Sequence, residues 1–400
     1  MRKDRDFFPN LMLHCPIVST GAAYQLPFAT KRAEDNRFVA NLMDSTAGKP
    51  LAQSSARIQW IDAIKGLGIS LIVIGHIWAL DDRSLFYEWI FAFHVPLFFF
   101  AAGLNLKPKI TAPLAFARLR FQQLMTPYII FALIGYLFHL GGYLLTKGQA
   151  NPPAAFADGL WIPLFGILEG RVGDGRLVNS PLWFLPALLI ALVACHAINH
   201  RLQNTAARLA IVAMMSGIAL WVGDGMALPF SINAALIGLL FIQVGFEYRR
   251  VGFPLPHRST GAIGLMAIAF AITLFAPLNA PVDLAKATVN QPLLYLLFAG
   301  AGIIFCLVGT RIAPSIIQSW LARIGRHSLV ILVTHMLIIK AVKVGLYLIT
   351  GISIDTMEHS VLLGLAVLAI TCLIMLPTGA VIIRWFPWML GQKSRPLAPH

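Results

Sequence analysis

Charged residues are scarce in this chain of 400 residues. They make up 12% of it, whereas soluble domains carry about 25%. Hydrophobic residues make up 58%. A water-facing surface needs more charge than this, so the composition argues against a soluble protein and predicts an all-α integral membrane protein.

Acidic residues and cysteines are also few. Seventeen Asp and Glu stand against 31 Lys and Arg, and the formal net charge is +14. The basic residues lie between apolar runs and not in one patch, which favours membrane topology over nucleic-acid binding. The four cysteines are scattered, and no pair has metal-ligand spacing. We therefore expect no disulfide framework, no metal and no nucleic-acid partner.

The first 56 residues are mixed, polar and weakly periodic. They have neither the short apolar core nor the small-residue cleavage site of a signal peptide. We interpret residues 1–56 as a loosely ordered cytoplasmic tail, and a later start at Met43 stays open. Residues 57–388 are then the membrane domain, and 389–400 form a short cytoplasmic tail.

Long apolar runs fill the predicted membrane domain, and a helix needs about 20 residues to cross the hydrocarbon. We predict ten spans, near 61–80, 86–106, 122–145, 182–200, 208–223, 229–247, 261–280, 291–310, 328–349 and 360–385. The run at 160–168 is too short to span and is expected to lie at the interface or to re-enter. No strong internal repeat is present, which disfavours an inverted-repeat transporter.

The distribution of Lys and Arg orients these spans. With the N-terminus inside, the only basic residues in outside segments are Arg83, Lys147, Arg171, Arg176 and Lys286. Lys65, Lys340 and Lys343 fall within spans, and all the others are inside. This asymmetry predicts an even number of spans with both termini cytoplasmic.

The first span, "WIDAIKGLGISLIVIGHIWAL", contains Asp62, Lys65 and His76. On a helix these three residues lie within a sector of about 60°, and His76 is about 16 Å beyond Lys65 along the axis. Intramembrane ionisable residues are candidates for function. Plainer alternatives stay open: Lys65 can snorkel to the headgroups, Asp62 can simply pair with Lys65, and His76 can bond to a neighbouring helix.

The second span contains a further histidine, His94, two residues before Pro96. Proline removes the amide that would bond to Ala92, so we expect a kink there. A free carbonyl and the imidazole would then share a polar spot. The alternative is that His94 only caps the kink.

Several segments resemble integral-membrane acyltransferase family 3. Lys65, ten residues and then Gly75-His76 is similar to its basic-X10-His motif. "FHVPLFFFAAG", "TPY" at 126–128, "SPLWFLPALL" at 180–189 and "SLVILVTH", ending at His335, resemble later spans. The closest likeness is to the fucose 4-O-acetylase-like branch. The family often has Arg-X-X-Arg before the third span, but here Arg120 is followed by Gln123, with Arg118 nearby.

The resemblance implies an enzyme, an O-acyltransferase of the bacterial inner membrane. Its implied donor is cytoplasmic acetyl-CoA. Its implied acceptor is a glycan or lipid-linked oligosaccharide, among membrane lipids and with polysaccharide export machinery as a possible partner. The rival readings are a proton-coupled secondary transporter of a small sugar or acid, using His76 and Lys65, and a structural member of an export complex.

Acyl transfer needs a base for the acceptor hydroxyl, donors for the oxyanion and a held donor. We expect His76 to be the base, Asp62 to position Lys65, and His94 or His335 to supply a donor or a second proton-transfer group. Three basic residues are expected to hold the coenzyme A phosphates: Lys65, Arg118 and Arg120. Two aromatic residues, Trp183 and Phe184, offer a surface for sugar stacking, although an interfacial aromatic belt explains Trp183 equally well.

Overall fold

The computed structural model describes residues 51–78, 85–107, 112–146, 154–156, 158–172, 175–223, 225, 228–252 and 259–392. The chain divides into two units, Met1–Ser54 and Ser55–His400, and the helical bundle belongs to the second. Of the predicted N-terminal tail, residues 1–50 lie outside the described part, as does Met43. The predicted outside positions Arg83 and Lys147 also lie outside it.

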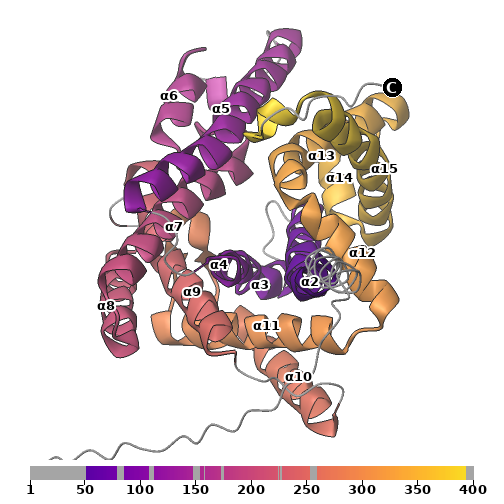
Figure 1. The fold of residues 1–400 in the computed structure, drawn as a ribbon. Helices are drawn as coiled ribbons and strands as arrows, with labels where there is room; N and C mark the ends of the chain where they lie inside the picture. Colours follow the sequence, from indigo (N-terminus) through magenta and orange to yellow (C-terminus); the bar gives the residue numbers. More distant parts are fainter. Residues whose placement is uncertain are drawn as a thin grey trace, which may run out of the picture. The chain divides into compact units, whose positions relative to one another are not determined.

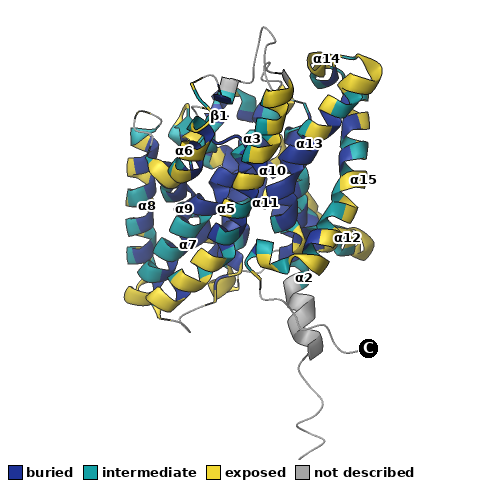
Figure 2. Cartoon of the chain, turned by 90° about the horizontal axis from the view of Figure 1, so that it is seen from above, coloured by how far each residue is buried: buried dark blue, intermediate teal, exposed yellow. Residues whose placement is uncertain are grey.

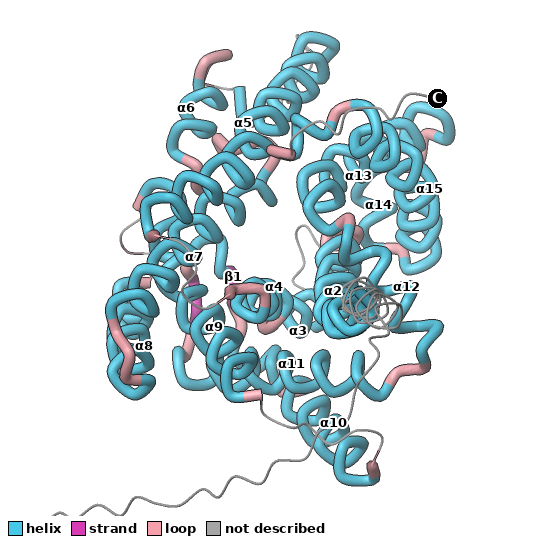
Figure 3. Tube along the Cα trace, viewed as in Figure 1, coloured by secondary structure: helices cyan, strands magenta, loops and turns pink. Residues whose placement is uncertain are grey.

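Helices dominate the described part of the chain (Figures 1 and 3). They are α2 (Leu51–Gly75), α3 (Leu85–Phe91), α4 (His94–Leu104), α5 (Pro113–Thr146), α6 (Ile162–Glu169), α7 (Phe184–Arg201), α8 (Thr205–Val222), α9 (Ile232–Val251), α10 (Thr260–Thr273), α11 (Pro292–Ile312), α12 (Ser315–Arg326), α13 (Ser328–Thr350), α14 (Ile354–His359) and α15 (Val361–Trp385). Short 3-10 turns include η2 (Ser180–Trp183) and η4 (Ala276–Asn279). Two short strands, β1 (Val282–Asp283) and β2 (Thr288–Val289), pair antiparallel.

Within the described residues, eight helices are long and apolar enough to cross a membrane: Leu85–Leu104, Pro113–Leu145, Ser180–Arg201, Thr205–Val222, Pro229–Val251, Pro292–Ile312, Ser328–Thr350 and Val361–Trp385. Each corresponds to a predicted span, so the protein is an all-α, multi-pass membrane protein. The predicted spans 61–80 and 261–280 are not among the eight. The first is realised as α2, and the second contains the shorter α10 followed by η4. A total of ten, and the sidedness of the termini, stay predictions.

Exposed residues lie along the outer faces of the bundle (Figure 2), and many of them are large and apolar. Leu145 on α5, Trp221 on α8 and Leu376 on α15 are 88%, 86% and 73% exposed. Exposed apolar surface of this extent is expected where the surrounding solvent is lipid. The same figure shows α12 at one end of the bundle and α14 with β1 at the other.

The interior is built where helices touch backbone to backbone. α4 packs against α9 and α11 (Figure 1). A Cβ at Gly103 of α4 would collide with the Ile242 carbonyl of α9. Similarly, α2 crosses α12 at two glycines: a Cβ at Gly66 would meet the Leu321 carbonyl, and one at Gly325 would meet the Asp62 carbonyl. Gly66 of the first span therefore serves a close helix crossing.

Candidate active site

His76 lies in the turn just past the end of α2, one residue beyond Gly75. Its backbone N–H lies 3.2 Å from both the Ile72 and Val73 carbonyl oxygens, so the last turn of α2 still holds it. The side chain is partly exposed. On α13, His335 is fully buried, and its ring centroid is 5.3 Å from that of His76. The structure thus brings together two histidines 259 positions apart in sequence.

The third histidine, His94, is the first residue of α4 and follows the break between α3 and α4. Phe91, the last residue of α3, contacts the His76 ring edge-on at 6.2 Å and the His94 ring at 4.7 Å. The helix breaks at Ala92 and Phe93, and Pro96 lies in the first turn of α4. The missing proline amide does no harm in a first turn. The break therefore lies just before His94, at Ala92, whose carbonyl would have bonded to the amide that Pro96 lacks.

The hydrogen bonds of His94 and His335 assign their tautomers. Nδ1 of His94 is 2.8 Å from the Ile90 carbonyl oxygen. Nδ1 of His335 is 3.0 Å and 2.9 Å from the carbonyl oxygens of Ile331 and Leu332. A carbonyl only accepts, so Nδ1 carries the proton in both rings. In each neutral ring Nε2 is then an acceptor.

This assignment narrows the roles predicted for the two residues. The Nε2 of His335 is buried and has no hydrogen-bond partner in the described structure. A neutral ring in this tautomer cannot donate to an oxyanion through Nε2, but it can accept a proton or a hydroxyl hydrogen bond. The geometry therefore argues against donation to the oxyanion and favours an acceptor role, for a proton or for a hydroxyl hydrogen bond.

Two lysines on α13 lie near the same histidines. The buried Lys343 donates from Nζ to the carbonyl oxygen of Ile77 at 3.1 Å and to Glu358 Oε1 at 2.6 Å. Lys340 donates from Nζ to His139 Nε2 at 3.0 Å. Both lysines, like His94 and His335, are within electrostatic range of His76.

Sequence reasoning gave these groups no role. Lys340 and Lys343 fall within a predicted span, and ionisable residues at such depth are the signal that pointed to His76. The same signal applied to His139 on α5, whose Nδ1 bonds to the Gly135 carbonyl oxygen. The signal for Glu358 was absent, because it follows the span in a predicted loop.

Asp62 and Lys65 lie on α2, well before the histidines. Lys65 Nζ is 2.5 Å from Asp62 Oδ1, and their side chains are 24% and 10% exposed. α2 is continuous from these residues to Gly75, so about 16 Å of helix separates Lys65 from His76. Asp62 thus contacts Lys65 and not His76, as the sequence predicted from spacing. The pairing alternative for Asp62 describes the same contact.

The two arginines of the third span differ in surroundings. Arg120 donates to Gln123 Oε1 at 2.9 Å, and its guanidinium lies 5.1 Å from the Phe116 ring centroid. Arg118 is exposed. The two residues are about 200° apart around α5, so Arg118 does not share the face of Arg120. Gln123, which stands where the family often has arginine, is a direct partner of Arg120.

Trp183 and Phe184 are packing residues in this structure. Each is 7% exposed. Phe184 contacts Phe98 and Phe99 with ring centroids at 5.9 Å and 5.1 Å, and Trp183 lies edge-on to Phe184. Neither offers an open face to a sugar or to a headgroup. Their predicted role in sugar stacking would require this aromatic cluster to open.

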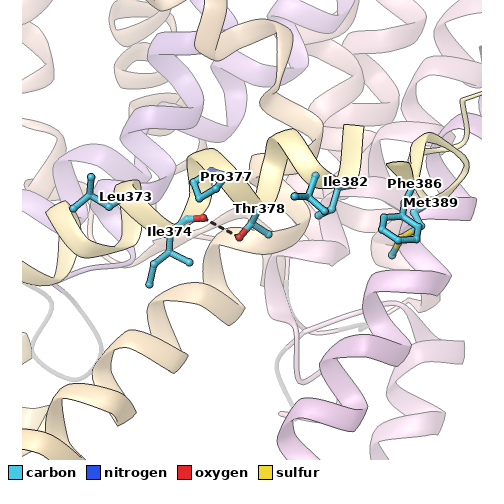
Figure 4. A pocket seen from close by; sticks show the side chains of 8 residues that line it. Leu373, Ile374, Pro377, Thr378, Ile382, Phe386 and Met389 are labelled. Atoms are coloured by element: carbon cyan, nitrogen blue, oxygen red, sulfur yellow. Dashed lines mark hydrogen bonds between the residues drawn. The ribbon is translucent and has the colours of Figure 1, made fainter. Parts of the chain in front are cut away.

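Two apolar grooves lie away from the histidines. One, of about 630 Å³, follows α15 from Leu373 to Ile382 and continues past the helix end to Phe386 and Met389. It includes Thr378, which bonds back to Ile374 at 2.8 Å (Figure 4). The other, of about 620 Å³, lies between α3, α10 and η4 and includes Trp89. Neither groove includes an ionisable residue. In the described part of the chain, no group of three or more His, Cys, Asp or Glu is arranged to hold a metal ion.

The comparison with protein families decides among the possible enzyme classes. The model of the acyltransferase domain Acyl_transf_3 matches residues 58–378. The chain belongs to acyltransferase family 3. The match begins before Trp60 and includes α2, α4, α5 and the His335 region of α13. The chain matches no curated protein and no solved structure.

Membership in this family makes the protein a membrane acyltransferase. The fucose 4-O-acetylase-like branch is a finer assignment that the family match does not reach.

Proposed function

We propose that this acyltransferase moves an acetyl or other short acyl group from acyl-CoA to a hydroxyl of a glycan. The arrangement of α2 carries the proposal. One helix presents Lys65, held by Asp62, and then His76 about 16 Å further along. This separation is comparable to an extended pantetheine arm, so the phosphates and the thioester of one donor molecule can be held at the two positions.

The donor is proposed to be acetyl-CoA bound from the cytoplasmic side. Lys65 contacts its phosphates, because an ammonium that is already ordered by Asp62 loses little freedom on binding an anion. Arg120 is the second proposed phosphate ligand, with part of its guanidinium already committed to Gln123. Arg118 is exposed and is proposed to act as a peripheral cation for the same phosphates.

The chemistry is proposed to centre on His76. Its imidazole takes the proton of the acceptor hydroxyl as that oxygen attacks the thioester carbonyl carbon. The new C–O ester bond forms and the C–S bond breaks. The departing sulfur receives the proton from the imidazolium and leaves as the free thiol of coenzyme A. An imidazole suits both proton transfers because the same ring nitrogen can accept a proton and then donate it.

His335 and His94 are proposed to assist as acceptors. A second hydroxyl of the sugar donating to Nε2 of His335 would satisfy the buried nitrogen that has no partner among the described residues. The acceptor is proposed to be a cell-surface glycan or a lipid-linked oligosaccharide in the bacterial inner membrane. Its presentation by polysaccharide export machinery is part of the same proposal, which rests on the likeness to the fucose 4-O-acetylase-like branch.

Two measurements test the proposal. The purified protein in lipid vesicles is given acetyl-CoA labelled in the acetyl group together with a glycan extract from cells that lack the protein. Labelled glycan is the expected product, and O-acetyl content of the cell-surface glycan should fall when the protein is removed. Proton-coupled uptake of a sugar into the vesicles without acetyl-CoA, and no labelled glycan, would support the transporter instead.

A further inference from the structure

Hydrogen bonds from residues outside α2 hold the turn that carries His76. Just after His76, the Ile77 carbonyl oxygen accepts from Lys343 of α13 at 3.1 Å. Lys343 in turn binds Glu358 of α14 at 2.6 Å. The next residue, Trp78, donates from its indole N–H to the carbonyl oxygen of Ser360 at 3.3 Å. Lys343 and Ser360, both distant in sequence, therefore hold two consecutive residues beside the proposed base, and Glu358 holds Lys343.

We propose that Lys343 and Glu358 are positioning residues that keep His76 facing His335. The inference rests on the proposed function, in which His76 is the base. The two residues contact no reacting atom in this role. They act through the backbone of Ile77, whose carbonyl lies just past the end of α2, where helical carbonyls have no intrahelical partner.

The burial of this ion pair argues for such a role. The side chains of Lys343 and Glu358 are 4% and 9% exposed. Bringing two charges out of water is expensive, and well-packed apolar residues often stabilise a fold as well or better. Packing alone thus gives no reason for the pair, whereas a charge-assisted hydrogen bond to one specific carbonyl does.

α13 fixes His76 at two heights. His335 meets the His76 ring, and Lys343, eight residues later on the same helix, meets the carbonyl of the following residue. The two contacts are about 12 Å apart along α13. Two contacts from one rigid helix restrict both the height and the rotation of the His76 turn. A free helix end, in contrast, frays.

A glycine of the neighbouring helix α15 leaves room for the Trp78 side chain. Gly364 has no side chain, and a Cβ at that position would collide with the indole of Trp78. The Trp78 ring therefore lies directly against α15, close to its start. This contact is separate from the Lys343–Glu358 pair, so it supports the position of the turn independently of charge.

The test separates positioning from stability. Lys343→Met leaves Glu358 as an unpaired buried charge, so it is compared with the double variant Lys343→Met/Glu358→Leu, which removes both charges. A second double variant, Arg208→Met/Glu247→Leu, removes an ion pair of equal burial on α8 and α9, with side chains 5% and 9% exposed. Each purified protein is measured for thermal stability, acetyl-CoA binding, and kcat and KM for glycan acetylation.

We expect the Lys343→Met/Glu358→Leu variant to fold and to bind acetyl-CoA within about twofold of wild type, with kcat lowered about 10–100-fold, because small misplacements of a catalytic group have effects of this size. The control pair should leave kcat unchanged per folded molecule. Lys343→Arg, which retains a charged donor, should recover part of the lost kcat.

Wild-type kcat in the folded double variant would overturn the inference, as would an equal loss of kcat in the control pair. A loss of acetyl-CoA binding equal to the loss of kcat would overturn it too, because positioning of His76 does not involve the donor phosphates. Absence of transfer by the wild-type protein would instead overturn the proposed function, and the inference with it.

Discussion

Two regions of the bundle bury polar side chains among apolar helices, and they do so in opposite ways. Between α7, α8 and α9, Asn199 and Gln243 exchange amide hydrogen bonds of 2.8 Å and 3.1 Å, and Gln243 also donates to Glu247 at 3.0 Å. Glu247 is bound by Arg208 at 2.8 Å and by Arg250 at 2.6 Å. The side-chain oxygens and amide nitrogens of this network point at one another.

The histidine centre of His76, His94 and His335 differs because not all of its ring nitrogens are paired. Nδ1 of His94 and Nδ1 of His335 each bond to a backbone carbonyl oxygen, but the buried Nε2 of His335 has no partner in the part of the chain that the structure describes. An unsatisfied polar atom is costly in a medium of low dielectric. The amide and carboxylate groups of the first network satisfy one another, and Nε of Arg208 is its one buried atom without a partner among the described residues. We interpret this network as one that holds helices together, and the open Nε2 of His335 as a place where substrate completes the bonding.

The largest expected effect is that of His76→Ala on catalysis. Loss of a general base typically lowers the rate about 10²–10⁴-fold. Acetyl-CoA binding should survive, because Lys65 is about 16 Å away. Acetyl-CoA titration of the purified variant, with binding and transfer measured separately, checks both statements. Normal transfer would remove His76 from the mechanism, and lost donor binding with normal binding in Lys65→Ala would exchange the roles of the two residues.

The second prediction concerns the polar network around Glu247. Glu247→Gln leaves Arg208, whose side chain is only 5% exposed, without its carboxylate. Breaking a buried pair in this way typically costs about 3–5 kcal/mol of stability. The variant should therefore unfold at lower temperature or denaturant concentration, while kcat per folded molecule stays at the wild-type value. A selective loss of kcat at unchanged stability would place this network in catalysis and end the contrast.

The third prediction concerns the donor end of α2. Lys65→Ala should raise the acetyl-CoA concentration needed for half-maximal rate roughly 10–100-fold, since a hydrogen bond to a charged group contributes about 1.5–3 kcal/mol. Lys65→Arg should lose less, because it retains the charge. Steady-state kinetics with acetyl-CoA varied at saturating acceptor measure the effect. A lowered kcat with unchanged donor KM would contradict a phosphate-binding role.

Much of the fold could be predicted from the sequence, because the length of an apolar run decides whether it can form a membrane-spanning helix. Eight predicted spans match helices in the structure, and the depth of His76 relative to Lys65 followed from helical rise alone. The break at Ala92 and Phe93 lies where the sequence predicted a kink, because Pro96 has no amide to bond to the Ala92 carbonyl.

The candidate site was accessible only in part for a different reason. His76, His94 and His335 stood out as ionisable residues in apolar runs. The contact between His76 and His335, and the bond from Lys343 to the Ile77 carbonyl, depend on which helices are neighbours, and a single sequence carries no such information. Trp183 and Phe184 illustrate the converse: their types suggest a sugar surface, but their neighbours bury them.

The smallest expected effect is also the one that best defines the open side of the histidine centre. His335→Leu removes the unpartnered Nε2 acceptor while filling the buried space with an apolar side chain. A neutral hydrogen bond contributes about 1 kcal/mol, so the rate should fall only several-fold to about tenfold if Nε2 accepts from a sugar hydroxyl. His335→Gln places an amide oxygen in the same region and should recover part of this loss.

If His335 instead transfers a proton, the amide cannot replace it, and both variants should be equally slow with an altered pH–rate profile. Initial rates across acceptor concentration and pH distinguish these outcomes. Wild-type kinetics in His335→Leu would show that the buried nitrogen has no part in the reaction.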